Sequence, residues 1–240
     1  MKNLKIFKNS RVIVTGHTGF KGSWLTAWLK ELGANVMGIS LDPTTYPSHY
    51  MVSKIYKGIK DIRLDICKKK KIEKKIIAFK PNFIFHLAAQ SLVGLSYQNP
   101  TITWQTNVLG TLNILESLRK LNNACNAVII TSDKCYHNKE IHYGYKETDV
   151  LGGKDPYSGS KASAEILIKS YISSFFKNNS KIRIATARAG NVIGGGDWAK
   201  NRIIPDCVRS WSKNKKVLLR NPNATRPWQH VLEAVGGYLC

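Results

Sequence analysis

The sequence predicts an α/β fold, a doubly wound parallel sheet with helices on both faces. Three observations lead to this prediction. Short runs rich in β-branched residues alternate with longer segments of helical periodicity along most of the chain. The predicted strands are apolar almost throughout, which is typical of strands buried on both faces. Right-handed crossovers between such strands place helices on both sides of the sheet.

The predicted elements alternate from the start of the chain. Strands are predicted at 11–15, 35–40, 60–66, 82–88, 127–132 and 181–188. Helices are predicted over 20–32, within 67–80, over 103–121, over 157–176 and from 231 onward. Residues 1–188 thus contain every strand of the sheet and form the first predicted domain. Residues 189–240, rich in Gly, Pro, Asn and Arg, are predicted to be part of a second, smaller domain.

Composition limits the class of protein. The 240 residues contain no long apolar run and no signal peptide, which predicts a cytoplasmic protein without a membrane span. The five cysteines are scattered and form no CxxC pair, so neither a disulfide framework nor a metal site is expected. The net charge of +22 would suit nucleic acid. However, its densest run, at 67–80, carries isoleucines at near-helical spacing, so we interpret it as an amphipathic surface helix and expect no specific nucleic-acid binding.

Three glycines, Gly16, Gly19 and Gly22, separate the first strand from the first helix. A glycine loop between a strand and a helix N-terminus lets a dinucleotide pyrophosphate approach the backbone. The spacing is GxxGxxG rather than GxGxxG, and an ordinary strand–helix turn is the alternative. His17 lies inside the loop, where it either adjusts cofactor affinity, in part as a cation, or is a plain polar loop residue.

Two further motifs carry chemistry. Tyr157 and Lys161 are four residues apart on a predicted helix and share one face, where an ammonium lowers the pKa of a phenol. Taken alone, such a pair is more often surface decoration. Ser132, Asp133 and Lys134 follow the fifth strand, at the sheet edge where ligands bind, and supply a donor, an acid and a base. An ordinary polar turn is the alternative for this triplet.

Together, the glycine loop, "HLAAQ", "TNVLGT" and YxxxK resemble the extended short-chain dehydrogenase/reductase family, with its Rossmann-like fold. Within that family, "GHTGFKGSWL", "SDKCY", "LGGKDPYSGSK", "ARAGNVIGGGDWA" and "RPWQHVLE" are similar to the enzymes that dehydrate CDP-glucose. The resemblance covers essentially the whole chain. It implies conversion of CDP-D-glucose to CDP-4-dehydro-6-deoxy-D-glucose, with NAD as a recycling cofactor, in the synthesis of deoxysugars for O-antigen lipopolysaccharide. A homo-oligomer is also expected.

The resemblance implies a role for each catalytic residue. Tyr157 takes the C4 hydroxyl proton while hydride passes to NAD. Lys161 holds the nicotinamide ribose and keeps the tyrosine acidic, and Ser132 hydrogen-bonds the C4 oxygen. Asp133 protonates the departing C6 hydroxyl, and Lys134 removes the C5 proton. Related dehydratases usually have a glutamate at the position of Lys134, and a lysine acts as a base only where its pKa is lowered.

The resemblance also implies binding residues. The cofactor set comprises Gly16, His17, Gly19, Phe20, Lys21 and Gly22 in the phosphate loop, Asp65 and Ile66 at the adenine, Leu87, Ala88 and Gln90 on the strand-four wall, Asn107 nearby, and Tyr157 with Lys161. Ser40 stands where an acid commonly holds the adenosine ribose, and Asp42 follows two residues later. The substrate set comprises Ser132, Asn191, Arg202 and Arg226, since guanidinium groups suit a pyrophosphate.

Two alternatives stay open. A different nucleotide-sugar epimerase or dehydratase would use the same fold, but an epimerase needs only the tyrosine, the lysine and the hydroxyl. Family members are longer, so the chain is expected to stop inside the substrate domain, and an inactive nucleotide-binding fragment is the second alternative.

Overall fold

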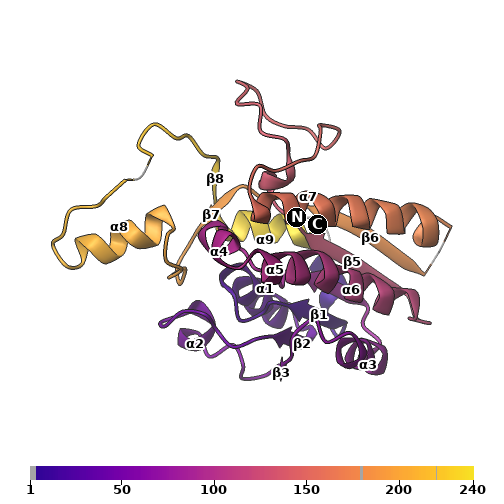
Figure 1. The fold of residues 1–240 in the computed structure, drawn as a ribbon. Helices are drawn as coiled ribbons and strands as arrows, with labels where there is room; N and C mark the ends of the chain where they lie inside the picture. The colour runs from indigo at the N-terminus through magenta and orange to yellow at the C-terminus, as the bar shows by residue number, and fades with distance from the viewer. Residues whose placement is uncertain (1–3, 179–180, 220) are drawn as a thin grey trace.

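The sheet has the predicted doubly wound architecture. The computed structural model describes residues 4–178, 181–219 and 221–240. Six parallel strands lie in the order β3-β2-β1-β4-β5-β6 (Figure 1). They are β1 (Arg11–Thr15), β2 (Asn35–Ser40), β3 (Lys60–Arg63), β4 (Phe83–His86), β5 (Cys125–Ile130) and β6 (Ile182–Ala187). The strand order reverses between β1 and β4, and in sheets of this kind ligands bind at that point, at the carboxyl ends of the strands.

Helices connect these strands. The helices of the first half are α1 (Phe20–Glu31), α2 (His49–Val52), α3 (Lys69–Phe79), α4 (Val93–Gln98), α5 (Pro100–Trp104) and α6 (Gly110–Arg119). Those of the second half are α7 (Pro156–Tyr171), α8 (Ile203–Trp211) and α9 (Val231–Leu239). Short 3₁₀ turns lie at η1 (Leu4–Phe7) and η3 (Asp133–Cys135), and π-helical turns at η2 (Gln105–Leu109) and η4 (Ile172–Phe176). In the described part of the chain, no helix combines the length and hydropathy needed to cross a membrane.

Two apolar cores explain why the strands are hydrophobic on both faces. In β1, Ile13 packs into the core beneath α3, α6 and α7, whereas Val12 and Val14 pack into the core beneath α1 and α9. All three side chains are fully buried. The lysine-rich segment is the predicted amphipathic helix: Ile72 and Ile76 of α3 are fully buried, while its lysines face solvent.

The predicted helix over 103–121 differs from the structure in its start and its winding. It begins at Pro100, and the π-helical turn η2 interrupts it between α5 and α6. Asn107, in this turn, is 1% exposed. Its side chain donates to Ser160 Oγ at 2.9 Å and accepts from the Gln90 backbone N–H at 2.8 Å. The wider π-helical turn places the Asn107 amide where it links Gln90, which follows β4, to Ser160 of α7. Turns of this kind are frequent at functional sites.

The C-terminal part returns to the sheet. Strand β7 (Asn191–Ile193) pairs in parallel with β8 (Trp228–His230), and the intervening segment with α8 extends away from the sheet (Figure 1). Helix α9 packs against α1, where Val231 and Val235 are fully buried. The division at residue 188 stays a prediction, but α9 shares a core with the first 188 residues.

Candidate active site

The three loop glycines have different neighbours. Gly16 has a φ of +74°, and a Cβ on it would lie 2.7 Å from the backbone nitrogen of Ala88. A Cβ on Gly22 would lie 2.1 Å from the Gly16 carbonyl oxygen. Among the described residues, a Cβ on Gly19 would approach only that same oxygen, at 3.3 Å. Gly16 and Gly22 therefore let the chain pack on itself, while Gly19 keeps the front of the loop open.

The open front fits a dinucleotide pyrophosphate. Gly19 is the N-cap of α1 and, as a glycine, offers no side-chain acceptor to the first N–H groups of α1. A bare helix N-terminus offers donors and a positive dipole end to phosphate oxygens. Leu87 and Ala88, at the end of β4, lie beside Gly16 as the predicted wall. The phosphate-loop residues are therefore suited to a dinucleotide.

The close contact at Gly22 makes a direct prediction. We expect Gly22→Ala to destabilise the fold by about 1–3 kcal/mol and to weaken dinucleotide binding, because the added methyl group meets rigid backbone. A Cβ on Gly144 meets nothing within 4 Å, so Gly144→Ala is the matched control and should change stability by less than about 0.5 kcal/mol. Urea unfolding measures both variants. Equal stability of the two would contradict the steric argument.

His17 does not face the front of the loop. Its ring is fully buried and turned toward Gly38 of β2, where an added Cβ would lie 2.4 Å from the ring. Nε2 donates to Asp61 Oδ1 at 2.8 Å, and Tyr50 packs edge-on at 5.5 Å between ring centroids. Burial lowers the pKa of His17 below its usual 6.5. The expectation of a cationic ring beside the phosphates is therefore wrong, because burial disfavours the charged form.

At the end of β2, where the adenosine ribose is expected to bind, the structure places an arginine, Arg63, that the sequence did not indicate. The Ser40 hydroxyl, at the end of β2, shares a 2.8 Å hydrogen bond with Thr18 of the glycine loop. Asp42 is 85% exposed and accepts from Nε of Arg63 at 2.8 Å. Arg63 ends β3, directly opposite Ser40 in the parallel register. Only strand pairing brings Arg63 there, so no local motif could have indicated it.

The predicted adenine edge and wall form hydrogen-bonded turns. The Asp65 carboxylate accepts from the backbone N–H of Cys67 at 2.8 Å. Ile66 is buried, and its carbonyl accepts from Asn113 Nδ2 at 2.9 Å. The Gln90 side chain bonds both backbone groups of Leu92. Asn107 is held by Gln90 and Ser160 as described above.

The catalytic residues gather at the carboxyl end of β5. Ser132 is the N-cap of η3, and its hydroxyl donates to Asp133 Oδ1 at 2.9 Å. Tyr157 and Lys161 lie on the first two turns of α7 and are 7% and 6% exposed. Asp155 caps α7 by accepting from the Ser158 N–H and hydroxyl, which fixes the turn that carries Tyr157. The tyrosine–lysine pair is thus buried rather than surface decoration.

The influences on the pKa values of Tyr157 and Lys161 differ from those expected. Burial raises the pKa of Tyr157, and the nearby Ser132 side chain is the largest influence that lowers it. Burial, with the charge of Lys21, lowers the pKa of Lys161 to about 8. Lys161 Nζ donates to the carbonyl of Ile130 at 3.2 Å. Ser132, rather than Lys161, is therefore the main group that favours the Tyr157 phenolate in this geometry.

The predicted substrate residues are spread along the C-terminal part. Arg202 donates to Asp197 Oδ2 at 2.8 Å and Ser91 Oγ at 3.3 Å, and its charge lowers the pKa values of both Tyr157 and Lys21. Asn191 lies in β7. Arg226 is exposed, and its Nη1 donates to the Thr225 carbonyl. Arg202 is thus the guanidinium that the fold brings toward the catalytic residues.

A buried ion pair between Glu165 of α7 and Arg188 holds this helix against the sheet. Glu165 extends the face of Tyr157 and Lys161 by one further interval of four residues. Arg188, just after β6, donates to both of its carboxylate oxygens, at 2.8 and 2.9 Å, and Thr131 also donates to it. Although burial opposes its charge, these bonds hold the pKa of Glu165 below its usual range. The repeated four-residue spacing was visible in the sequence, but its partner was not.

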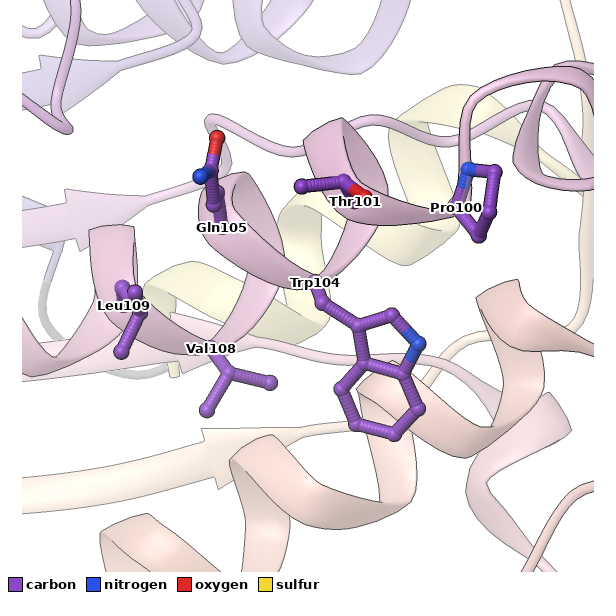
Figure 2. Close-up of a pocket in the computed structure, with 6 residues that line it drawn as sticks. All are labelled: Pro100, Thr101, Trp104, Gln105, Val108 and Leu109. Carbon is purple, nitrogen blue, oxygen red and sulfur yellow. The ribbon is translucent and has the colours of Figure 1, made fainter.

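Two open pockets lie away from the catalytic residues, on the outside of α5, η2 and α7. The first has a volume of about 440 Å³ and is lined by Pro100, Thr101, Trp104, Gln105, Val108 and Leu109 (Figure 2). Its Trp104 ring lies against α7, 3.4 Å from where a Cβ on Gly159 would stand. This shallow apolar surface contains none of the catalytic groups. Among the described residues, no group of His, Cys, Asp and Glu side chains could hold a metal ion.

A parallel sheet with this strand order, a glycine loop and a buried tyrosine–lysine pair define a short-chain dehydrogenase/reductase of the extended type. The family model for GDP-mannose 4,6-dehydratase matches residues 13–239, and the chain belongs to that family. The chain is 47% identical to CDP-glucose 4,6-dehydratase of Salmonella typhimurium, over all of this chain and 68% of that relative. The resemblance found in the motifs is therefore confirmed.

Solved structures agree on the fold. An epimerase of Methanothermobacter thermautotrophicus superposes with a TM-score of 0.86 at 24% identity, covering 98% of this chain and 68% of its own. The UDP-glucose 4-epimerase of Thermus thermophilus, in complex with NAD, gives 0.80 at 25% identity, covering 95% and 73%. The chain spans only 47–58% of the next three curated relatives.

Proposed function

We propose that this chain carries the NAD-dependent dehydration of CDP-D-glucose to CDP-4-dehydro-6-deoxy-D-glucose. The observation that carries the proposal is the position of Asp133, whose carboxylate accepts a hydrogen bond from Ser132 and whose charge acts on the pKa of Tyr157. An epimerase has no use for an acid at that point, whereas a dehydratase must protonate a leaving hydroxyl. The 47% identity to a CDP-glucose 4,6-dehydratase supports the substrate.

NAD, when bound, accepts a hydride from C4 of the sugar and later returns it to C6. The glycine loop and α1 would hold its pyrophosphate, and Lys161 would contact its nicotinamide ribose. Tyr157 would take the C4 hydroxyl proton while Ser132 donates to the same oxygen. The Ser132 side chain lowers the pKa of Tyr157, so the two hydroxyls lie close enough for one sugar oxygen to meet both.

Elimination follows from the new C4 ketone, which acidifies the C5 proton. We assign Lys134 as the base for this proton and Asp133 as the acid that lets the C6 hydroxyl leave as water. Both residues lie in the 3₁₀ turn η3, next to Ser132. Addition of hydride at C6 and of a proton at C5 completes the reaction, so that the net change is loss of one water.

The test is incubation of the protein with CDP-glucose and NAD, followed by detection of the 4-keto sugar through its absorbance in alkali. The dehydratase gives a keto product of 18 mass units less than the substrate, since water is lost. An epimerase would give an isomer of unchanged mass. No conversion of either kind, with NAD binding intact, would favour a nucleotide-binding fragment.

Asp133 provides a sharper prediction. We expect Asp133→Asn to slow loss of the C6 hydroxyl by about 10²- to 10⁴-fold, because an amide keeps the shape but has no acid proton. Oxidation at C4 should persist, and reduced cofactor should accumulate in a single turnover. Asp149→Asn, which removes a carboxylate from the loop before α7, is the control. Normal formation of 6-deoxy product by Asp133→Asn would exclude Asp133 as the acid.

Three broader features belong to this proposal. A homo-oligomer is supported by exposed apolar side chains on α5, η2 and α7: Leu109, in the pocket of Figure 2, is 50% exposed, Ile102 is 53% exposed, and Ile166, in a second pocket beside α7, is 59% exposed. A role in O-antigen lipopolysaccharide deoxysugar synthesis is supported by the proposed product. A cytoplasmic location stays a prediction from the sequence.

A further inference from the structure

We propose that Glu165 and Arg188 are positioning residues, which hold the catalytic turn η3 in place against the catalytic helix α7. The turn, with Ser132 as its N-cap, carries the proposed acid and base, and α7 carries the tyrosine and the lysine. The inference rests on the proposed function, because it gives the ion pair a task in the chemical steps. Replacing a buried ion pair by apolar residues often costs no stability, so stability alone does not account for this pair.

Glu165 ties α7 to the end of β5. It follows Lys161 by four residues, so the two side chains share one face of the helix. Its Oε1 accepts from the hydroxyl of Thr131, the residue directly before Ser132. Thr131 and Glu165 are 4% and 5% exposed, so solvent has little access to this hydrogen bond. The start of the catalytic turn is thus fixed by the helix that carries Tyr157.

Arg188 connects the other end of η3 to the same carboxylate. Its Nε and Nη2 donate to the two oxygens of Glu165 at 2.8 and 2.9 Å, a bidentate geometry that fixes the plane of the guanidinium. Its Cζ lies over the ring of Tyr136, 4.8 Å from the centroid, and Tyr136 directly follows η3. A cation over the face of a phenol ring is attracted to it. Arg188 therefore contacts the turn at its end, while Thr131 anchors its start.

Backbone hydrogen bonds join the same two segments. The N–H of Thr131 donates to the carbonyl of Ala187 at 3.0 Å, and the N–H of Asp133 donates to the carbonyl of Ala189 at 3.3 Å. Arg188 lies between these two acceptors in the chain. The segment that holds the turn through its backbone therefore also holds it through the guanidinium, and this guanidinium is fixed to α7 by Glu165.

The position of the turn matters for the chemistry. One sugar oxygen must meet both Ser132, at the start of η3, and Tyr157, on α7. Burial lowers the pKa of Lys161 to about 8, and the charge of Glu165 opposes this shift. A displacement of about 1 Å between reacting groups can slow a reaction about a hundredfold. Loss of the ion pair should therefore slow hydride transfer even in a protein that stays folded.

The experiment separates catalysis from stability. Glu165→Ala combined with Arg188→Met removes both charges, and urea unfolding should show that the variant keeps much of the wild-type stability. Its kcat with CDP-glucose, and the rate at which reduced cofactor appears in a single turnover, should nevertheless fall by about tenfold to a hundredfold. The KM for CDP-glucose and the Kd for NAD should stay within about threefold, because the pair touches neither ligand. A merely stabilising pair would regain its activity together with its stability.

Thr131→Val is the second variant, and it decides the matter if the double variant fails to fold. Valine keeps the shape of threonine and removes the hydroxyl that donates to Glu165. We expect kcat to fall by about fivefold to tenfold with KM unchanged, and Thr131→Ser, which keeps the hydroxyl, to restore kcat to within about twofold of wild type. Glu73→Ala is the matched control, since it breaks the ion pair with Lys120 and should leave kcat unchanged.

A wild-type kcat in either folded variant would overturn the inference. The proposed function can fail separately, because a 4-epimerase also begins with hydride transfer from C4 to NAD. A wild type that forms only an isomer of the sugar would refute the dehydration, whereas slower hydride transfer in the variants would still support the inference. A wild type that transfers no hydride from CDP-glucose would refute both.

Discussion

Tyr157→Phe is expected to abolish hydride transfer, with turnover falling by about 10²- to 10⁴-fold, while NAD affinity stays nearly unchanged. The phenol is the proposed proton acceptor, and its ring is 7% exposed in the packing of α7. Phenylalanine preserves that packing and removes only the hydroxyl that meets Ser132. Product formation and reduced cofactor in a single turnover give the rate, and titration gives the affinity.

Ser158→Ala is a useful comparison, since it changes a neighbouring hydroxyl that only supports the helix cap through Asp155. It should retain most of its turnover. If Tyr157→Phe retained most of its turnover as well, the assignment of the tyrosine as the base would fail.

Glu165→Ala should cause the largest loss of stability, about 3–5 kcal/mol, because it leaves the guanidinium of Arg188 buried without its partner. Glu165 and Arg188 are only 5% and 14% exposed as side chains. Arg188 Nη1 is buried and has no hydrogen-bond partner within the described residues, so the guanidinium depends on the carboxylate. Urea unfolding of the variant gives the change in free energy.

Two further variants separate this pair from an ordinary ion pair. Glu73→Ala breaks the more exposed pair with Lys120 and should cost about 1 kcal/mol or less. Glu165→Ala combined with Arg188→Met removes both charges and should recover much of the lost stability. A loss at Glu165 no greater than that at Glu73 would show that burial adds nothing to this pair.

Local periodicity predicted most of the fold because the apolar pattern that identifies each helix or strand lies within a short segment. β1 and β2 begin and end at the predicted residues, and α1 begins at Phe20 as expected. The helix over 103–121 was predicted less well, since η2 depends on Asn107 bonding residues 17 and 53 positions away. α9 packs into the core with α1, which no local pattern could indicate.

The residues of the candidate site also fall into two groups, those that local motifs predict and those that only the tertiary structure brings together. The glycine loop, the tyrosine–lysine spacing and the triplet after β5 are local patterns whose chemistry depends on nearby residues, so the sequence by itself determined them. Tertiary structure alone decided that His17 is buried, with its pKa lowered, that Arg63 holds Asp42, and that Arg188 meets Glu165. These contacts join residues 44, 21 and 23 positions apart. They exist because parallel strand pairing and helix packing bring such residues together, and because a hydrogen bond offsets much of the free-energy cost of burying a polar group.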